Sequence, residues 1–297
     1  MPSAPRLILA PLRGVTIRAF REAFAPQIAE TGFDEAVTPF IPAAPGFDPL
    51  KDRELVGFRG ERQAGLAVTP QLIGKDPVSF RTALLRLRDA GFETADLNCG
   101  CPFPMVRNKG RGSGILRTPD VLRRMLEVGC ETMGEGRFSI KARLGVERND
   151  ELLALMPLIN EFPLRFLVVH ARNAKQMYDG ECDWTAYGKV AAAAKVPVVP
   201  NGDLEAGDVR DGSPCVMVGR SFIRSLGMRS DAADLVLRYI DRSLEELHGD
   251  RPVLGRIKEL VAYWRDQPKW RRRWNILKLA RNVDELKSAL PCGLAQA

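Results

Sequence analysis

Short apolar runs alternate with amphipathic segments over about 230 residues of this 297-residue chain, and no other feature constrains the fold as strongly. The runs are four to seven residues long, aliphatic or β-branched, and most end in a polar or glycine-containing turn. Strands are predicted at residues 7–11, 35–38, 66–72, 94–98, 138–143, 166–170, 196–201 and 215–218. Helices are predicted between them at 78–89, 119–133, 151–160 and 184–194.

Eight strands that alternate with helices favour an α/β fold, the closed (β/α)8 TIM barrel, over an open sheet. No G-x-G-x-x-G motif follows the first strand, which argues against a dinucleotide-binding fold. One unit is short. Only ten residues, EAGDVRDGSP, separate NGDL from the eighth strand, so we expect a truncated or missing helix there.

After about residue 235 the pattern becomes helical throughout, with apolar residues at three- and four-residue spacings. This predicts two domains, a barrel over residues 1–235 and an all-helical bundle over 236–297. The bundle has thirteen Lys/Arg against eight Asp/Glu, or +5 of the net +7, which leaves +2 for the barrel. A basic tail on a near-neutral body indicates a polyanionic partner, although a solvated helical face gives the same count.

The composition excludes several classes of protein. No apolar run reaches the ~20 residues of a membrane span, and RLILAPL near the N-terminus is too short for a signal peptide. The six cysteines do not have the spacing of a disulfide scaffold or of paired zinc knuckles. We therefore expect a cytoplasmic monomer with reduced thiols, no membrane association and no obligate protein partner.

The carboxyl ends of the strands, where function collects in such barrels, are rich in polar groups. In chain order they carry Pro11-Leu12, Gln71, Asn98 to Pro102, Lys141-Ala142-Arg143, His170-Ala171-Arg172, Asn201-Gly202-Asp203 and Gly219-Arg220. His170 ends a strand in line with Lys141, which favours a ligand-facing role, whereas His248 lies at a helix end and is expected at the surface. The VMVGR ending fits a phosphate held by backbone N–H groups and a guanidinium.

The stretch DLNCGCP places Cys99 and Cys101 two residues apart at a strand end. With two histidines in the chain and no second cysteine cluster, a metal site is not expected. Side chains alternate along an extended segment, so one thiol should face the pocket and the other should pack. A glycine-rich loop with Arg107, Lys109 and Arg111 follows, and it either meets phosphate groups or is simply solvated.

These motifs resemble those of a known family. The strings LAPLRGVT, QLIG, DLNCGCP, IKARLG, VVHARNAKQMYDGECDW, VPNGDL and VMVGR occur in the order found in the tRNA-dihydrouridine synthases. The resemblance implies an FMN-dependent barrel that reduces a uridine of the tRNA D-loop to 5,6-dihydrouridine, with NADPH as the reductant. The tail RIKELVAYWRDQPKWRRRWNILKLARN is most similar to the bacterial subfamily C, which modifies position 16.

The matching motifs imply a role for each site residue. Cys101 is the catalytic thiol, Asn98 lies beside the uracil, and Arg143 and Tyr178 contact the substrate base. The flavin-binding positions are Pro11, Leu12, Gln71, Lys141, His170, Asn201, Asp203, Gly219 and Arg220. The chain departs from the family pattern at Leu12, where methionine is more usual, and at Phe103-Pro104, where small or basic residues are.

The implied chemistry agrees with these residue types. Saturating the uracil 5,6 bond takes a hydride from flavin N5 and a proton from an acid on the other face. A thiol with a pKa near ~8.5 stays protonated at neutral pH and can donate that proton. Lys141 and His170 would lie near the N1–C2 edge of the flavin, and Arg143 would stabilise enolate charge on the base.

The target base lies inside a folded RNA and must be extruded to reach the flavin. We expect phosphate contacts to offset that cost. The candidate RNA contacts are Arg107, Lys109 and Arg111 in the loop and Arg265, Lys269, Arg271, Arg272, Arg273, Lys278 and Arg281 in the tail. Tryptophans are interleaved with the tail cations, and Trp264 and Trp274 are expected in the core of the helical domain.

Two other functions share part of this pattern. A flavin barrel acting on a free pyrimidine such as dihydroorotate would need the same pocket without the basic tail. An RNA-binding relative without catalysis would need the basic tail, but it would need neither Cys101 nor the polar residues around Lys141 and His170.

Overall fold

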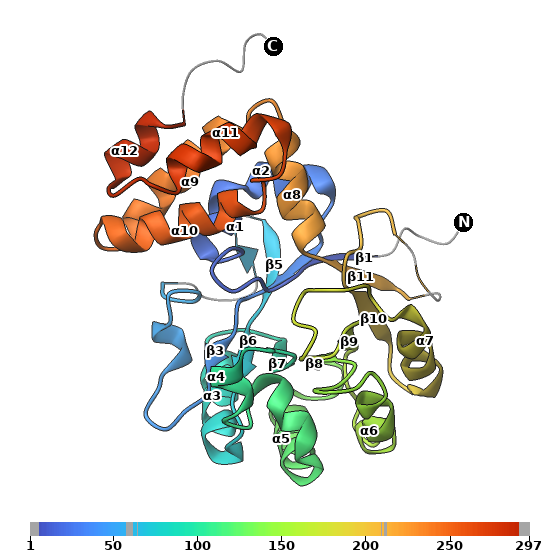
Figure 1. Ribbon diagram of the computed structural model, residues 1–297. Coiled ribbons are helices and arrows are strands. Elements are labelled where there is room, and N and C mark those ends of the chain that lie inside the picture. The colour runs from blue at the N-terminus through green and yellow to red at the C-terminus, as the bar shows by residue number, and fades with distance from the viewer. Residues whose placement is uncertain (1–5, 58–61, 64, 209, 211–212, 291–297) are drawn as a thin grey trace.

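The strands of this protein form one mostly parallel sheet that closes on itself (Figure 1). The computed structural model describes residues 6–57, 62–63, 65–208, 210 and 213–290. β5 (Leu66–Thr69) and β6 (Gln71–Ile73) are consecutive pieces of one path that Pro70 interrupts, because proline has no N–H for the ladder. β5 pairs with β2 and β6 pairs with β7, so this path joins the two halves of the sheet into a barrel.

Eight strand positions make up the barrel. In chain order they are β1 (Arg6–Leu9), β2 (Glu35–Val37) continued by β3 (Ile41–Pro42), β5 continued by β6, β7 (Ala95–Cys99), β8 (Phe138–Arg143), β9 (Leu167–His170), β10 (Val198–Asn201) and β11 (Cys215–Val218). β11 pairs with β1 to complete the ring, and the short β4 (Arg62–Gln63) pairs antiparallel with β5. The predicted (β/α)8 barrel is confirmed, with strand ends within two residues of those predicted except where β3 extends the second strand to Pro42.

The helices between the strands cover the outside of the barrel (Figure 1). The predicted ones are α3 (Pro77–Asp89), α5 (Pro119–Met133), α6 (Glu151–Ile159) and α7 (Trp184–Ala193). Five further elements were not predicted, namely α1 (Arg18–Ala23), α2 (Ala25–Thr31), α4 (Pro104–Arg107) and the short 3-10 turns η1 (Pro49–Lys51) and η2 (Gly112–Arg117). Between β10 and β11 the described residues contain no helix, as the short spacing predicted.

The C-terminal part is helical, as predicted, and packs directly on the barrel. It consists of α9 (Ala232–Glu246), α10 (Asp250–Ala262), α11 (Pro268–Leu277) and α12 (Val283–Ser288), which follow α8 (Arg220–Met228). Phe20 of α1 meets Tyr239 of α9 edge to face at 5.9 Å between ring centroids. Residue 235, the predicted domain boundary, lies inside α9, and the division into two domains stays a prediction. Among the described helices, none has the length and apolar character to cross a membrane.

Tryptophan side chains anchor the tail to α8. Trp264 and Trp270 are fully buried, and their indole N–H groups donate to the carbonyls of Ile223 (2.6 Å) and Gly227 (2.8 Å). A Cβ at Gly227 would lie 2.4 Å from Trp264, so only glycine allows this approach. Trp264 is a core residue as expected, and the ring that packs on it, at a tilt, is that of Trp270. The expectation of a core position for Trp274 is wrong, because its side chain is only half-buried.

Candidate active site

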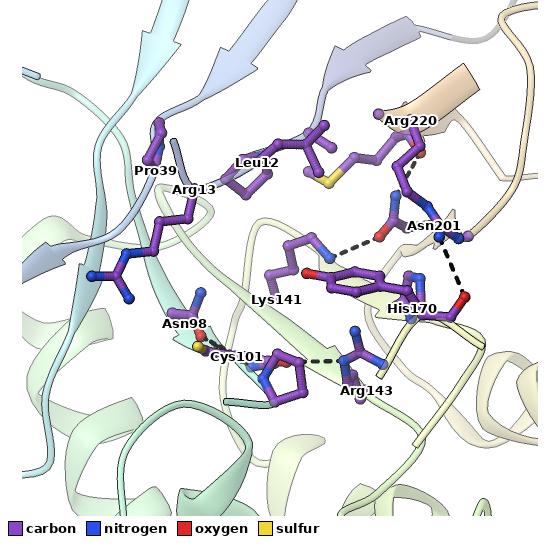
Figure 2. A pocket seen from close by; sticks show the side chains of 18 of the residues that line it. Leu12, Arg13, Pro39, Asn98, Cys101, Lys141, Arg143, His170, Asn201 and Arg220 are labelled. Carbon is purple, nitrogen blue, oxygen red and sulfur yellow. Dashed lines mark hydrogen bonds between the residues drawn. The ribbon is translucent and has the colours of Figure 1, made fainter. Parts of the chain in front are cut away.

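A pocket opens at the carboxyl ends of the parallel strands, where the polar strand ends converge (Figure 2). Twelve of the thirteen predicted catalytic, flavin and base contacts line it, namely Pro11, Leu12, Asn98, Cys101, Lys141, Arg143, His170, Tyr178, Asn201, Asp203, Gly219 and Arg220. They come from six strands or the loops after them, so only barrel closure brings them together.

Gln71 is the exception. Its side chain is fully buried and is not among the residues that line the pocket, and both ends of its amide are hydrogen-bonded to neighbours. Its Nε2 donates to Asp96 (2.7 Å) and its Oε1 accepts from Asn98 (2.7 Å). The predicted flavin contact at Gln71 stays a prediction, because its buried side chain is not part of the pocket lining.

Cys101 and Cys99 point in opposite directions, as the strand alternation predicted. Cys101 lines the pocket and is 6% exposed, whereas Cys99 is fully buried in the apolar layer between sheet and helices. Burial raises the pKa of the Cys101 thiol, and the N–H of Phe103 and the charges of Arg13 and Arg143 offset this only in part. The thiol is therefore protonated at neutral pH, which suits a proton donor and not a nucleophile.

The floor of the pocket is basic. Lys141 donates to Asn201 (2.8 Å), which in turn donates to the carbonyl of Met217 (2.9 Å). Burial lowers the pKa of Lys141 to about 7, and the nearby Arg143 adds to the effect. Burial, and then the charges of Arg143 and Lys141, hold the pKa of His170 well below its usual value, so the imidazole is neutral.

One buried polar atom in this floor lacks a partner. The Nδ1 of His170 makes no hydrogen bond to any residue that the structure describes. Buried polar atoms are nearly always paired, so this one indicates a ligand that supplies the missing bond. A flat heterocycle with acceptors and donors along its edge fits the arrangement of Lys141, His170 and Asn201.

An ion-pair cluster closes one end of the pocket at the start of α8. Arg172 and Arg220 both pair with the carboxylate of Asp203. Burial works against this carboxylate, but the bond from Arg172 and the charge of Arg220 hold the pKa of Asp203 below its usual value. With two cations and one carboxylate, this end keeps a net positive charge beside the N-terminus of a nine-residue helix. Such an end fits a phosphate.

Arg143 ties the loop that carries Tyr178 to the strand end that carries Cys101. Its guanidinium donates to the carbonyls of Gly100 (3.0 Å) and Met177 (2.6 Å) and to that of Asn173. The Tyr178 ring lies 5.2 Å from the Arg143 guanidinium carbon and 5.1 Å from that of Arg220. Tyr178 is 40% exposed, so its ring is held over the pocket by cations and still meets solvent.

Sequence reasoning missed part of the pocket wall. Arg13, Pro39 and Phe40 also line it, with the Arg13 guanidinium carbon 5.3 Å from the Phe40 ring centroid. Arg13 follows directly on the predicted Pro11-Leu12 contact, and that proximity in sequence was the available signal. Phe40 had no signal, because the loop after β2 contains no recognisable motif.

The predicted RNA contacts differ in their exposure and in whether their charges already interact with other groups of the protein. Lys109, Arg271, Arg272, Lys278 and Arg281 are exposed, Arg107, Arg111 and Arg273 are half-buried, and none of these eight pairs with a carboxylate in the described part of the chain. Arg265 is exposed but lies 3.6 Å from Asp266. Lys269 is half-buried and donates to the carbonyl of Arg229, so its ammonium is turned towards the protein.

Known structures share the fold at low sequence identity. Morphinone reductase superposes with a TM-score of 0.51 at 14% identity, over 74% of this chain and 83% of that one. The old yellow enzyme homologue from Zymomonas mobilis gives 0.51 at 12% identity, over 74% and 85%. These similarities establish a TIM-barrel fold of the old yellow enzyme type and nothing about the reaction.

Curated relatives are more similar in sequence. A probable tRNA-dihydrouridine synthase from Rhodobacter capsulatus is 32% identical over 226 residues, which is 73% of this chain and 67% of that protein. A tRNA-dihydrouridine(16) synthase from Cupriavidus necator is 30% identical over 289 residues, 87% of each chain. The family model described as dihydrouridine synthase matches residues 8–224, which contain the whole pocket. This chain belongs to the dihydrouridine synthase family of flavin-dependent oxidoreductases.

Proposed function

We propose that this enzyme reduces a uridine of the tRNA D-loop to 5,6-dihydrouridine, with FMN in the pocket and NADPH as the electron source. The observation that carries the proposal is a protonated, pocket-facing Cys101 opposite a basic floor, in a chain of the dihydrouridine synthase family. The pocket fits FMN, since the buried Nδ1 of His170 has no hydrogen-bond partner among the described residues and the positively charged start of α8 suits a phosphate.

The residues that would hold FMN lie on one side of the pocket. Pro11, Leu12, Lys141, His170, Asn201, Asp203, Gly219 and Arg220 would contact it, with Arg220 and the first turn of α8 at the phosphate. Bound FMN supplies the hydride in this chemistry. Lys141 and the neutral His170 would hydrogen-bond the edge of its ring, where an ammonium stabilises negative charge.

Cys101 would deliver the proton that completes the reduction. Its sulfur lies beside Asn98 at the pocket surface, so a base bound over Cys101 meets the thiol on one face (Figure 2). The raised pKa keeps the proton on sulfur until the base accepts it. Asn98, Arg143 and Tyr178 would hold the uracil, and Tyr178 offers the only aromatic face among these three.

The unpaired cations of the loop and tail would hold the RNA. Extruding a base costs a few kcal/mol, and phosphate contacts by Lys and Arg are the usual compensation. Eight predicted contacts carry no internal ion pair in the described part of the chain, so their charge is available to phosphates. This basic surface is also what distinguishes the proposal from a barrel acting on a free pyrimidine such as dihydroorotate, which needs none.

Position 16 is the modification site that we propose. The Cupriavidus necator and Ralstonia nicotianae relatives are named tRNA-dihydrouridine(16) synthases, and the match to the former covers 87% of this chain. That match extends beyond the barrel into the basic helices, which are the part able to set how the RNA lies over the pocket. We further propose a cytoplasmic monomer.

The test is a reconstituted reaction. The purified protein with FMN and NADPH is incubated with unmodified tRNA, and dihydrouridine is mapped along the product. Dihydrouridine at position 16 is expected. Reduction only at another D-loop position would overturn the positional assignment alone. Turnover of dihydroorotate without activity on tRNA would support the free-pyrimidine alternative, and absence of bound flavin and of any turnover would support the inactive RNA-binding relative.

A further inference from the structure

Behind the pocket wall lies a row of buried polar side chains that ends at the backbone of Cys101. Asp96 and Asn98 stand two residues apart on β7, so both face the barrel interior. Gln71 on β6 is the register partner of Asp96 and lies between them. Asp96 and Gln71 are fully buried and Asn98 is 7% exposed.

Four hydrogen bonds connect the row. Asp96 Oδ1 accepts from Gln71 Nε2 at 2.7 Å, and Gln71 Oε1 accepts from Asn98 Nδ2 at 2.7 Å. Asn98 Oδ1 then accepts from the backbone N–H of Cys101 at 2.8 Å and of Gly100 at 3.2 Å. Ser139 donates to the other oxygen of Asp96 at 2.7 Å and stands outside the row.

The direction of these bonds is fixed at both ends, by the carboxylate of Asp96 and by the backbone N–H groups of Gly100 and Cys101. Burial raises the pKa of Asp96 to about 6, so at pH 7 and above the carboxylate is mainly ionised and can only accept. Asp96 therefore turns the Nε2 of Gln71 towards itself and leaves Oε1 facing Asn98. That oxygen turns the Nδ2 of Asn98 towards it and leaves Oδ1 facing Cys101. With both amides reversed, Asn98 would present N–H groups to the backbone N–H of Cys101, which places donor against donor.

We propose that Asp96, acting through Gln71 and Asn98, is a positioning residue that fixes the backbone of Cys101 and so aims its thiol into the pocket. The catalytic importance of that aim rests on the function proposed above, in which Cys101 donates the proton. The positioning of Cys101 does not rest on that function, because it depends only on hydrogen bonds within the protein. No direct contact joins Asp96 to Cys101, and the effect passes along the two amides.

Four variants separate this role from simple core packing. Gln71→Met nearly keeps the side-chain volume, Asp96→Leu keeps the branched shape with a larger volume, and both break the row. Asp96→Asn is the conservative variant: it retains an oxygen for Gln71, and the Ser139 hydroxyl can rotate to accept from the new amide. Ser139→Ala is the matched control, because it removes an equally buried hydrogen bond to Asp96 that does not lead to Cys101.

The first readout is the alkylation rate of each thiol in the purified full-length protein with iodoacetamide, located by mass spectrometry. Without the support of Gln71 or Asp96, Asn98 should hold the backbone N–H of Cys101 less firmly, and about tenfold faster alkylation of Cys101 is expected in Gln71→Met and Asp96→Leu. Asp96→Asn and Ser139→Ala should stay close to the wild-type rate. Cys99 and Cys215, both buried, report general loosening in the same molecules.

The second readout is the reoxidation of reduced flavin by tRNA. The two disruptive variants should slow this step about tenfold at saturating tRNA and leave the KM for tRNA unchanged. Wild-type alkylation of Cys101 in Gln71→Met, or equal acceleration at Cys99, would overturn the positioning role. A wild-type protein whose flavin tRNA does not reoxidise would overturn the proposed function instead, whatever the alkylation rates.

Discussion

Replacing Arg220 by alanine should weaken FMN binding while leaving the fold intact. Arg220 is the first residue of α8, and its side chain is 14% exposed at the end of the pocket. It pairs with Asp203 and donates to the carbonyl of Tyr178 at 3.3 Å. If the flavin phosphate binds at this helix N-terminus, Arg220 supplies a partly desolvated, charge-assisted contact to it.

The magnitude follows from that contact. A hydrogen bond to a charged group is worth about 1.5–3 kcal/mol, which corresponds to roughly 10- to 150-fold in the dissociation constant. The loss should lie towards the upper end, because Asp203 stays behind with Arg172 as its one remaining ion-pair partner among the described residues and the local charge falls by one. A carboxylate that is less neutralised repels the phosphate.

Arg224 offers a matched control. It lies one helical turn later on α8, is exposed, and forms no ion pair within the described residues. FMN is titrated into flavin-free protein and the quenching of flavin fluorescence is followed for wild type, Arg220→Ala and Arg224→Ala. An unchanged dissociation constant in Arg220→Ala would refute the phosphate assignment. Equal weakening in both variants would attribute the effect to net charge and refute the specific contact.

Three further predictions concern the thiol, the tail and the pH. Cys101→Ala should keep FMN and tRNA binding but form no dihydrouridine, while Cys99→Ala stays active, and the reverse pattern in the product assay would show that the acid is misassigned. Replacing the three arginines at 271–273 by alanine should make the plot of log K for tRNA binding against log salt concentration less steep, by about 0.9 for each phosphate that is no longer neutralised. Flavin reduction by NADPH should be unchanged. Arg265→Ala removes a cation already next to Asp266 and should change the slope less. Burial lowers the pKa of Lys141 to about 7 in the free protein. Hydrogen-bond acceptors on the flavin edge should favour the ammonium form, so Lys141 should take up a proton on binding and FMN affinity should fall as the pH rises above about 7. A Lys141→Met protein with the same pH profile as wild type would contradict this.

The order of elements and the identity of most site residues could be predicted from the sequence. Strand and helix patterns are local, since side-chain periodicity reflects which face of one element is buried. In a parallel barrel every strand carries its carboxyl end to the same rim, so Asn98, Lys141, His170 and Asn201 could be assigned to one site without knowing their distances. The short link before β11 likewise showed that a helix could not fit there.

Only the tertiary structure decided which polar side chains are exposed to the pocket and which surfaces of distant segments pack together. Gln71 follows the same strand-end pattern as Asn98, yet it is fully buried and its amide bonds Asp96 and Asn98, which the pattern did not indicate. The periodicity of the tail predicted its helices, but not that Tyr239 would share a core with Phe20, which lies near the other end of the chain. Such contacts depend on which surfaces meet after the barrel closes, and periodicity within one segment carries no information about the partner of that segment.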